Sequence, residues 1–325
     1  RRCGGYESSA SPCATADTTC MYIDFCKLNS AGNDFVCIDN TGGCFNFLFE
    51  NGRIGDFVEV VCRRGLGVGA DGVIMACQIG SGDGVDVVAR FLEPDGSEAR
   101  LCGNGTACFA YWLFESGILP GPEVTILTAA GTARGAQLPE GPRMIRVCVP
   151  DPRDLRKNVC LTAGGQHWHM DCVDSGVPHA VIRVGEALEG FDVDRFGRAI
   201  RKHEDFAPSG VNANFVNVVE EGRIAVRTFE FGVEAETLAC GTGSAAAAIL
   251  TALRERWPQE YLRSEKPVHV ETRSGATLRV WFVCHDGETV TDVCLDTRVN
   301  PVYEGRITEA FLLDMEERVG LRNPR

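Results

Sequence analysis

Two short cysteine–glycine motifs contain the residues best suited to chemistry. They are residues 102–105 (CGNG) and 240–243 (CGTG), and each joins a predicted strand to a predicted helix. Glycines there leave backbone N–H groups uncovered, and such groups at a helix start bind a carboxylate or phosphate together with the helix dipole. The same field is expected to lower the pKa of each cysteine from about 8.5 toward neutrality.

Two such cysteines facing one bound anion would suit inversion of the α-carbon of an amino acid. Inversion needs a base on one face of the carbon and an acid on the other. A thiolate would remove the proton, and the opposite thiol would return one. Without pyridoxal phosphate, helix dipoles aimed at the substrate carboxylate would stabilise the carbanion. Two other interpretations stay open: cysteines that merely fit tight turns, and a disulfide between Cys102 and Cys240.

An internal repeat relates the two motifs. Residues 90–105 (RFLEPDGSEARLCGNG) and 227–243 (RTFEFGVEAETLACGTG) share Arg, Glu, Gly, Glu-Ala, Leu and C-G-x-G in the same order. A weaker similarity relates residues 32–35 (GNDF) to 176–179 (GVPH). The repeat predicts two related domains that face each other across a cleft, each contributing one cysteine.

Short apolar runs broken by Gly, Asn and Asp predict strands around each motif. The segments that follow the motifs are apolar on most faces, which predicts buried helices, and Gly117 provides the first of them with a stop signal. Predicted strands cover residues 35–39, 73–77, 85–92, 124–128, 144–149, 180–184, 215–220, 224–229, 268–272, 277–283 and 291–295, and a further helix covers 193–203.

Composition excludes several classes of protein. The chain has 325 residues, 44% hydrophobic and 24% charged, which is typical of a folded chain of about two domains. The net charge of −13 disfavours nucleic-acid binding, and the four basic residues within 195–202 are interpreted as a solvated helix face. No run of 18 apolar residues is present, which disfavours a membrane span.

The 16 cysteines include no C-x-x-C pair, so neither a zinc knuckle nor any other metal site is expected. Most of them lie in apolar runs and are predicted to be small buried hydrophobes in a reducing compartment. They include Cys37, Cys62, Cys77, Cys148 and Cys284. We therefore expect a cytoplasmic protein. Residues 1–20 are polar and are predicted to be an unstructured extension; if they are a transit-peptide remnant, the protein belongs in a plastid.

Six segments resemble the diaminopimelate epimerase family, which works without pyridoxal phosphate. The resemblance covers nearly everything from residue 21 to about 307, in matching order and spacing. The segments are FCKLNSAGNDFVCID (25–39), RRGLGVGADGV (63–73), DGSEARLCGNGTACFA (95–110), SGVPHAV (175–181), IRKHEDFAPSGVNANFVNVV (200–219) and EAETLACGTGSAAA (234–247).

The resemblance implies an α/β (α+β) fold of two pseudo-symmetric domains, each a curved, mostly antiparallel sheet wrapped around a central helix. The first domain would comprise residues 21–149 plus about 300–315, and the second residues 150–299. The domains would close over the substrate, with hinges near residue 150 and at 299–301. A homodimer is a further expectation, with a small amino acid as substrate and no nucleic-acid or membrane partner.

The resemblance also implies an isomerase without a cofactor or metal, which interconverts LL- and meso-diaminopimelate for lysine or cell-wall synthesis. It assigns the catalytic bases to Cys102 and Cys240, with His179 and Glu230 assisting, one near each thiol. The substrate would be held by Asn33, Gly103, Asn104, Asn212, Gly241 and Thr242.

The chain departs from the family pattern where the far end of the substrate would bind. Phe231 stands where the family usually has Arg, and Glu93 stands where it usually has Asn. Loss of a bidentate partner for a second carboxylate leaves two alternatives open. One is a racemase of a different amino acid, in which Glu93 favours a basic side chain. The other is a non-catalytic amino-acid-binding homologue. Arg64, Arg223 or Arg227 could compensate for the missing Arg.

Overall fold

The computed structural model describes residues 22–314 except 83, 100, 186 and 187. The predicted extension at residues 1–20 lies outside this range. The first half contains β1 (Ile23–Ser30), β2 (Asn33–Asp39), α1 (Asn46–Glu50), α2 (Ile54–Cys62), β3 (Gly72–Gly82), β4 (Val85–Leu92), α3 (Gly103–Glu115), β5 (Glu123–Thr128), β6 (Gly131–Gln137) and β7 (Met144–Cys148).

The second half repeats this order and then returns to the first. It contains β8 (Arg153–Ala163), β9 (Gln166–Asp174), β10 (Pro178–Arg183), α4 (Val193–Arg201), a 3₁₀ turn (Glu204–Phe206), β11 (Asn212–Glu220), β12 (Arg223–Glu230), β13 (Ala235–Thr237), α5 (Gly241–Arg254), α6 (Gln259–Leu262), β14 (Val268–Glu271), β15 (Thr277–Cys284), β16 (Val290–Ile307) and α7 (Glu309–Leu313). None of the helices in the described residues is long and apolar enough to cross a lipid bilayer.

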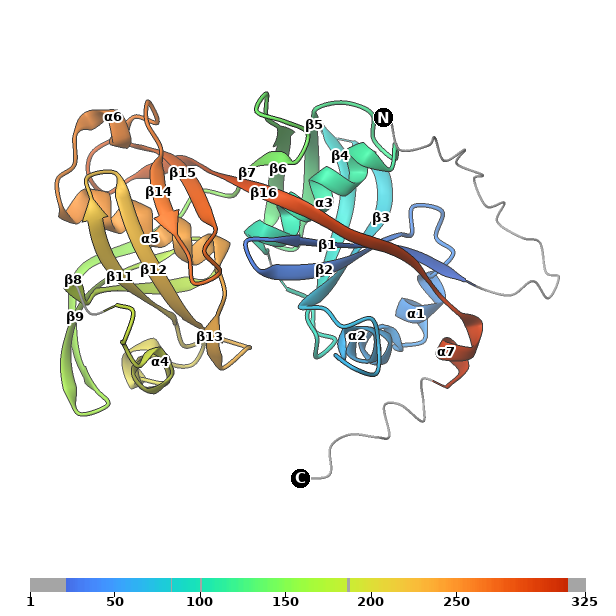
Figure 1. Cartoon of the computed structure of the whole chain (residues 1–325), viewed down its shortest axis with the longest axis horizontal. Helices are drawn as coiled ribbons and strands as arrows, with labels where there is room; N and C mark the ends of the chain where they lie inside the picture. The colour runs from blue at the N-terminus through green and yellow to red at the C-terminus, as the bar shows by residue number, and fades with distance from the viewer. Residues whose placement is uncertain (1–21, 83, 100, 186–187, 315–325) are drawn as a thin grey trace.

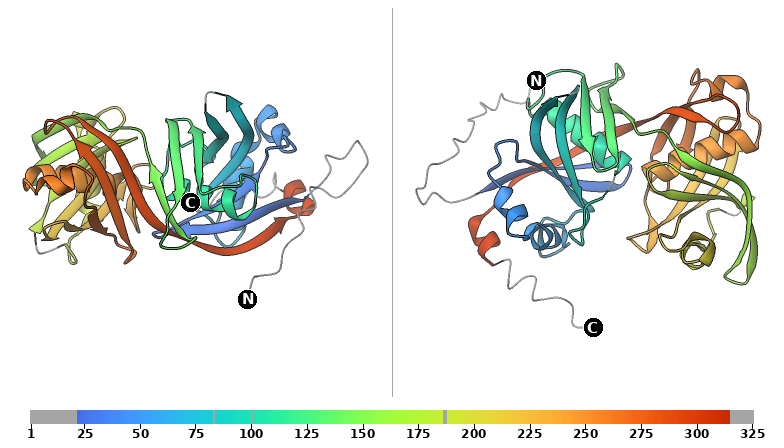
Figure 2. Two further views of the ribbon diagram at one scale, coloured as in Figure 1. Left: turned by 90° about the horizontal axis from the view of Figure 1, so that it is seen from above. Right: turned by 180° about the vertical axis from the view of Figure 1, so that it is seen from behind.

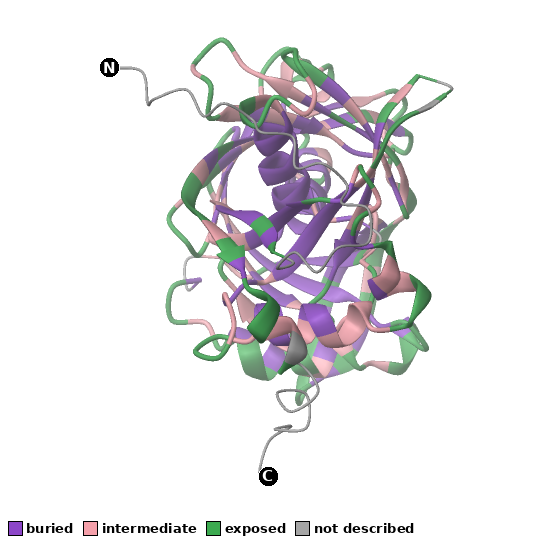
Figure 3. Ribbon diagram, turned by 90° about the vertical axis from the view of Figure 1, so that its right-hand side faces the viewer, coloured by how far each residue is buried: buried purple, intermediate pink, exposed green. Residues whose placement is uncertain are grey.

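The first half is a closed barrel around a buried helix. Strands β1 to β7 are hydrogen-bonded in sequence order, and β16 pairs with both β7 and β1, which completes the ring. Helix α3 fills the interior, and every residue from 103 to 113 is buried. Figure 3 shows this helix surrounded by strands. A helix that is apolar all round is buried in this way because no face of it favours water.

The second half wraps a curved sheet around α5 in the same way (Figure 1). Residues 241–252 of that helix are all buried. Both halves are mostly antiparallel, with parallel pairs at matching places: β2–β3 and β4–β5 in one, β10–β11 and β12–β14 in the other. The predicted pair of pseudo-symmetric sheets around central helices is therefore confirmed.

Strand β16 links the halves and is much longer than the predicted strand at 291–295. It pairs with β15 and β7 near its start and with β1 over residues 299–307 (Figure 2). The predicted hinge at 299–301 lies within that β1 ladder, so the chain passes between the halves earlier, near Leu295. The domain boundaries at 149/150 and 299/300 stay a prediction.

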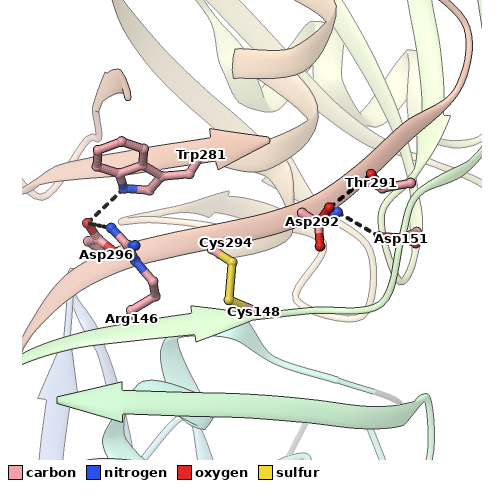
Figure 4. Close-up of a disulfide and its surroundings, with 8 residues drawn as sticks. All are labelled: Arg146, Cys148, Asp151, Trp281, Thr291, Asp292, Cys294 and Asp296. Carbon is pink, nitrogen blue, oxygen red and sulfur yellow. Dashed lines mark hydrogen bonds and ion pairs between the residues drawn. A yellow bond between two sulfur atoms is a disulfide. The ribbon is translucent and has the colours of Figure 1, made fainter. Parts of the chain in front are cut away.

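The two connections between the halves are cross-linked, which corrects one prediction from the sequence. Cys148, at the end of β7, forms a disulfide with Cys294 of β16, and the two residues are direct partners in the antiparallel ladder (Figure 4). Cys148 was expected to be a free buried thiol. A sequence separation of 146 residues gives no local signal, and only the pairing of β7 with β16 brings these sulfurs together.

Helix α2 is absent from the sequence prediction. Its start at Ile54 has no side-chain cap, because the N-cap residue is Arg53, whose side chain has no acceptor for the free helix N–H groups. A helix without Ser, Thr, Asp or Asn at its N-cap lacks the usual start signal. Its buried face, which includes Phe57 and Val61, packs in a separate cluster over the outer face of β2 and β3.

Candidate active site

The two predicted cysteines lie in equivalent places at the starts of α3 and α5. Cys102 is the N-cap of α3 (φ −132°, ψ 114°) and Cys240 is the N-cap of α5 (φ −118°, ψ 115°). Each sulfur accepts a hydrogen bond from the backbone N–H three residues later, at 3.4 Å from Gly105 N and 3.3 Å from Gly243 N. Each thiol therefore takes the capping position that a hydroxyl or carboxylate usually occupies.

The two helix starts also meet each other across the boundary between the halves. A β-carbon added to Gly241 would lie 3.3 Å from Gly103 Cα and 3.3 Å from Asn104 N. This close approach favours glycine at position 241, where a β-carbon would make the neighbouring backbone give way by a few tenths of an ångström. The positive ends of both helix dipoles, and their uncovered N–H groups, thus point into one small region, which is a suitable cradle for a carboxylate.

The expected lowering of the thiol pKa values is not what the structure gives. Burial raises the pKa of Cys102 to about 12 and raises that of Cys240 well above its usual value, although hydrogen bonds from Gly105 and Gly243 oppose this. The helix starts supply favourable donors, but the loss of water around a buried thiolate is the larger effect. Both sulfurs are free thiols here, so the alternative disulfide between them is not formed.

Glu230 lies at the end of β12 beside Cys240. Its carboxylate accepts a hydrogen bond from Thr237 Oγ1 and is hydrogen-bonded to the Cys240 thiol. Burial raises the pKa of Glu230 to about 7. The carboxyl is thus poised to exchange a proton near neutral pH, as a general acid or base requires. The sequence could have indicated Thr237 as a site residue, because it lies three residues before Cys240.

His179, at the start of β10, is fully buried and also lies on the Cys240 side. Its Nε2 is 3.0 Å from Thr242 Oγ1, which in turn is 3.5 Å from Cys240 Sγ. Burial lowers the pKa of His179 to about 3, so the ring is neutral. We expected His179 and Glu230 to serve different thiols; instead neither hydrogen-bonds Cys102 within the described residues.

The remaining predicted substrate residues surround the two helix starts. Asn104 Nδ2 donates to Asn33 Oδ1 at 2.7 Å, which links α3 to the β1–β2 turn. Asn212 Oδ1 accepts from the backbone N–H of Phe231 at 2.7 Å and so anchors the residue after Glu230. All of the predicted site residues therefore lie around one region, and each asparagine already holds a second element of the site.

Phe231 and Glu93 lie at neighbouring positions of the two copies of the repeat, in which Glu93 corresponds to Glu230. Phe231 is 52% exposed, and the guanidinium of Arg201 stacks on its ring at 4.4 Å from the centroid. Glu93 follows β4 and is open to solvent on one side, yet the crowding of protein around it raises its pKa to about 7. Its charge also raises the pKa of the Cys102 thiol, which places it near that end of the site.

The three arginines proposed to replace the missing family Arg are already paired. Arg64 binds Asp34 and Asp71, Arg223 binds Glu220 and Glu271, and Arg227 binds Glu236. Their charges are therefore largely neutralised. Arg201 was interpreted from the sequence as part of a solvated helix face, but it is largely buried: it pairs with Glu234 and is the cation that approaches Phe231. No local pattern in the sequence marks it, because α4 and the Phe231 loop are distant along the chain.

Solved structures share the fold of this chain. The structure superposes on a hydroxyproline epimerase from Agrobacterium vitis with a TM-score of 0.67, at 16% identity, over 89% of this chain and 93% of that one. A PhzF-family phenazine biosynthesis protein from Bacillus anthracis gives a TM-score of 0.65 at 17% identity, over 88% of this chain and 99% of that one. The chain has the two-domain fold of these two proteins.

Sequence comparison gives the family. A model described as diaminopimelate epimerase matches residues 25–147 and 172–294, one segment in each half. The diaminopimelate epimerase of Aquifex aeolicus is 41% identical over 292 residues, which cover 89% of this chain and 99% of that protein. That of Archaeoglobus fulgidus is 36% identical, over 71% of this chain and 81% of that protein. The chain belongs to the diaminopimelate epimerase family and is an isomerase.

Proposed function

We propose that this enzyme epimerises the α-carbon of diaminopimelate with Cys102 and Cys240 as its two bases and without a cofactor. The observation that carries the proposal is that two cysteine-capped helix starts meet. A β-carbon added to Gly241 would lie only 3.3 Å from Gly103 Cα. The related enzymes from Aquifex aeolicus and Archaeoglobus fulgidus support diaminopimelate as the substrate, and hence a role in lysine synthesis.

The substrate α-carboxylate binds the N–H groups at the two helix starts, in the motifs 102–105 and 240–243. One cysteine, as thiolate, takes the α-proton, and the electron pair left on carbon spreads into the carboxylate, which both helix dipoles stabilise. The opposite thiol then donates its proton to the other face of the carbon. The negative charge has then moved from one sulfur to the other. Glu230 lies beside Cys240 and can exchange a proton with it, which resets the two thiols for the next turnover.

Deuterium incorporation tests the proposal. The full chain is incubated with LL-diaminopimelate in D₂O under reducing conditions, and the α-carbons are followed by NMR and mass spectrometry. We expect the meso isomer with deuterium at the inverted carbon, and a loss of rate of roughly a thousandfold or more in Cys102→Ala and in Cys240→Ala. The exposed Cys160→Ala is the matched control and keeps the wild-type rate. A wild-type rate in either catalytic variant would overturn the proposal.

A second candidate function is racemisation of an amino acid with a basic side chain. It is favoured by Glu93 and Phe231 at the far end of the site and by the ion pairs that occupy Arg64, Arg223 and Arg227. A panel of amino acids in D₂O separates the two functions: faster exchange of lysine, ornithine or histidine than of diaminopimelate would favour it. The double variant Glu93→Asn/Phe231→Arg would then shift preference toward diaminopimelate. Tight binding with no exchange would instead indicate a binding homologue.

Location in the cytoplasm and assembly as a homodimer remain proposals. Sedimentation of the full chain tests the dimer, which a single 35.2 kDa species would contradict. The Cys148–Cys294 disulfide bears on the location, since such bonds persist in oxidising compartments. Cells lysed directly into an alkylating agent report whether the pair is reduced in place, as a cytoplasmic protein requires.

A further inference from the structure

Four buried polar side chains form a row of hydrogen bonds that ends at the sulfur of Cys240. Thr228 Oγ1 donates to Asn214 Oδ1 at 2.9 Å, and Asn214 Nδ2 is 3.1 Å from His179 Nδ1. His179 Nε2 is 3.0 Å from Thr242 Oγ1, which is 3.5 Å from the Cys240 sulfur. All four side chains belong to residues that are at most 5% exposed, so water does not compete for these bonds.

The orientation of the Asn214 amide is fixed by its surroundings. Its Nδ2 lies 3.0 Å from the carbonyl oxygen of Ala180 and 3.4 Å from that of Asn212, while its Oδ1 accepts from Thr228. A flipped amide would place its oxygen against two carbonyl oxygens, with no donor to offer them. The amide therefore presents N–H groups toward His179.

This orientation determines which nitrogen of His179 carries the proton. Since Asn214 Nδ2 can only donate, Nδ1 of the ring must accept and is unprotonated. The ring is neutral, because burial lowers its pKa to about 3, so its proton is on Nε2. Nε2–H then donates to the oxygen of Thr242, and the Thr242 hydroxyl proton is left to point at the sulfur of Cys240.

Among the described residues, the first half of the molecule has no such row of hydrogen bonds, as its strand registers show. His179 pairs with Asn212 in the β10–β11 ladder just as Phe35 pairs with Gly72 in the β2–β3 ladder. Asn214 pairs with Thr228 as Ile74 pairs with Phe91. The counterparts of His179, Asn214 and Thr228 behind Cys102 are thus Phe35, Ile74 and Phe91.

The glycines at the two helix starts show the same difference in packing. A β-carbon at Gly105 would meet Ile74 Cδ1 at 3.2 Å and Phe35 Cε1 at 3.3 Å. A β-carbon at Gly243 would meet Asn214 Oδ1 at 2.4 Å. Apolar groups therefore back one cysteine and hydrogen-bonding groups back the other, although the backbone geometry of the two sites is nearly the same.

We propose that Asn214 is a positioning residue, which holds His179 in its Nε2–H form and so directs the Thr242 hydroxyl proton onto Cys240. That hydroxyl proton stabilises the thiolate form of Cys240 when this sulfur acts as the base. No proton passes along these hydrogen-bonded side chains; they only orient the donors. The consequence for turnover rests on the proposed two-cysteine chemistry, but the ionisation of the thiols is measurable without any substrate.

Two measurements on the full chain test this. In the first, iodoacetamide alkylates the protein across a pH series, and mass spectrometry quantifies the Cys240 peptide; the thiolate attacks the methylene carbon and iodide leaves. Thr242→Val should raise the apparent pKa of Cys240 and slow its alkylation at pH 7 roughly tenfold, as loss of one bond to a charged group predicts. Thr242→Ser should restore the wild-type pH profile. The other titratable groups facing this sulfur are Glu230, Cys102 and His179.

Thr162→Val is the matched control, because Thr162 forms the same kind of bond to His167 on the surface, at 2.8 Å. It should leave the Cys240 profile unchanged. In the second measurement, ¹H–¹⁵N NMR of the wild-type imidazoles reads the tautomer of His179, which should be Nε2–H. Asn214→Asp, whose carboxylate accepts rather than donates, should convert it to Nδ1–H.

An Nδ1–H tautomer in the wild type, or an unaltered Cys240 profile in Thr242→Val, would overturn the proposal. The wild-type NMR measurement stands even if a variant fails to fold. Neither measurement depends on turnover, so a failure of the proposed function, seen as no α-proton exchange, is distinguishable from a failure of this inference.

Discussion

Two carboxylates near the thiols occupy corresponding positions of the repeat, yet they have different surroundings. Glu93 and Glu230 each follow the last apolar residue of the strand before a C-G-x-G motif, and burial raises the pKa of each to about 7. Glu230 is hydrogen-bonded to Thr237 and to Cys240, whereas Glu93 has no side-chain partner among the described residues. One carboxyl is therefore built into the site and the other is available to a ligand.

The raised pKa of Glu230 makes stability depend on pH. Between pH 4.5 and 7 the folded protein keeps this proton, while the unfolded chain has lost it, so the free energy of unfolding falls as pH rises through this window. The loss is roughly 3 kcal/mol for a single such group. Glu230→Gln should remove this part of the slope, as measured by urea unfolding at pH 5 and pH 8.

The exposed Glu189→Gln is the control for this measurement and should keep the wild-type slope. If Glu230→Gln and the wild type lose the same free energy of unfolding between the two pH values, the carboxyl does not hold its proton in the folded state. Turnover supplies an independent check, because Glu230→Gln should also lower kcat roughly 100-fold through loss of the group that exchanges protons with Cys240.

At the scale of elements, the site depends on how closely α3 and α5 approach end to end. Gly241→Ala would place a β-carbon 3.3 Å from Gly103 Cα and from Asn104 N, so the helix starts must separate by a few tenths of an ångström. Because both thiols move with their helices, we expect kcat/KM to fall roughly 10–100-fold, with a small change in the midpoint of thermal unfolding.

Gly190→Ala is the matched control for this variant. A β-carbon there would meet no atom within 4 Å, so neither activity nor thermal unfolding should change. Wild-type kcat/KM in Gly241→Ala would show that the separation of the helix starts does not limit catalysis.

At the scale of the whole molecule, both connections between the halves are joined at one point. The Cys148–Cys294 bond ties β7 to β16 there, and the same ladder holds Asp296, whose fully buried carboxylate accepts from Arg146 at 2.6 Å and Trp281 at 2.8 Å (Figure 4). The two strands should therefore move as one unit when the halves move relative to each other.

Reduction of this disulfide should destabilise the protein. The bond closes a loop of 146 residues, and release of such a cross-link lowers the free energy of unfolding by roughly 2–5 kcal/mol. Denaturant unfolding with and without dithiothreitol measures the effect. The double variant Cys148→Ser/Cys294→Ser should be insensitive to the reductant, whereas Cys160→Ser should respond as the wild type does. Equal responses in all three proteins would contradict a structural role for the bond.

Much of the fold was predictable because the apolar patterns are local. The strand at 85–92 has the predicted bounds, and the helices after Cys102 and Cys240 are buried on all faces as their composition indicates. Elements without local signals were missed or shortened. Helix α2 has no capping side chain, and the later part of β16 is polar and exposed along much of its length, so only its pairing with β1 makes it a strand.

The sequence by itself determined the kind of chemistry available: the repeat and its paired C-G-x-G motifs required two equivalent helix starts, each with one thiol, because glycine spacing and helix capping act within a few residues. The ionisation and partners of those thiols were decided by tertiary structure alone. Burial overcame the expected lowering of their pKa values, and long-range contacts between residues 35 and 63 positions apart placed Asn214, His179 and Thr242 behind Cys240. Desolvation and long-range hydrogen bonds depend on which strands become neighbours, and that is set only when the whole chain is folded.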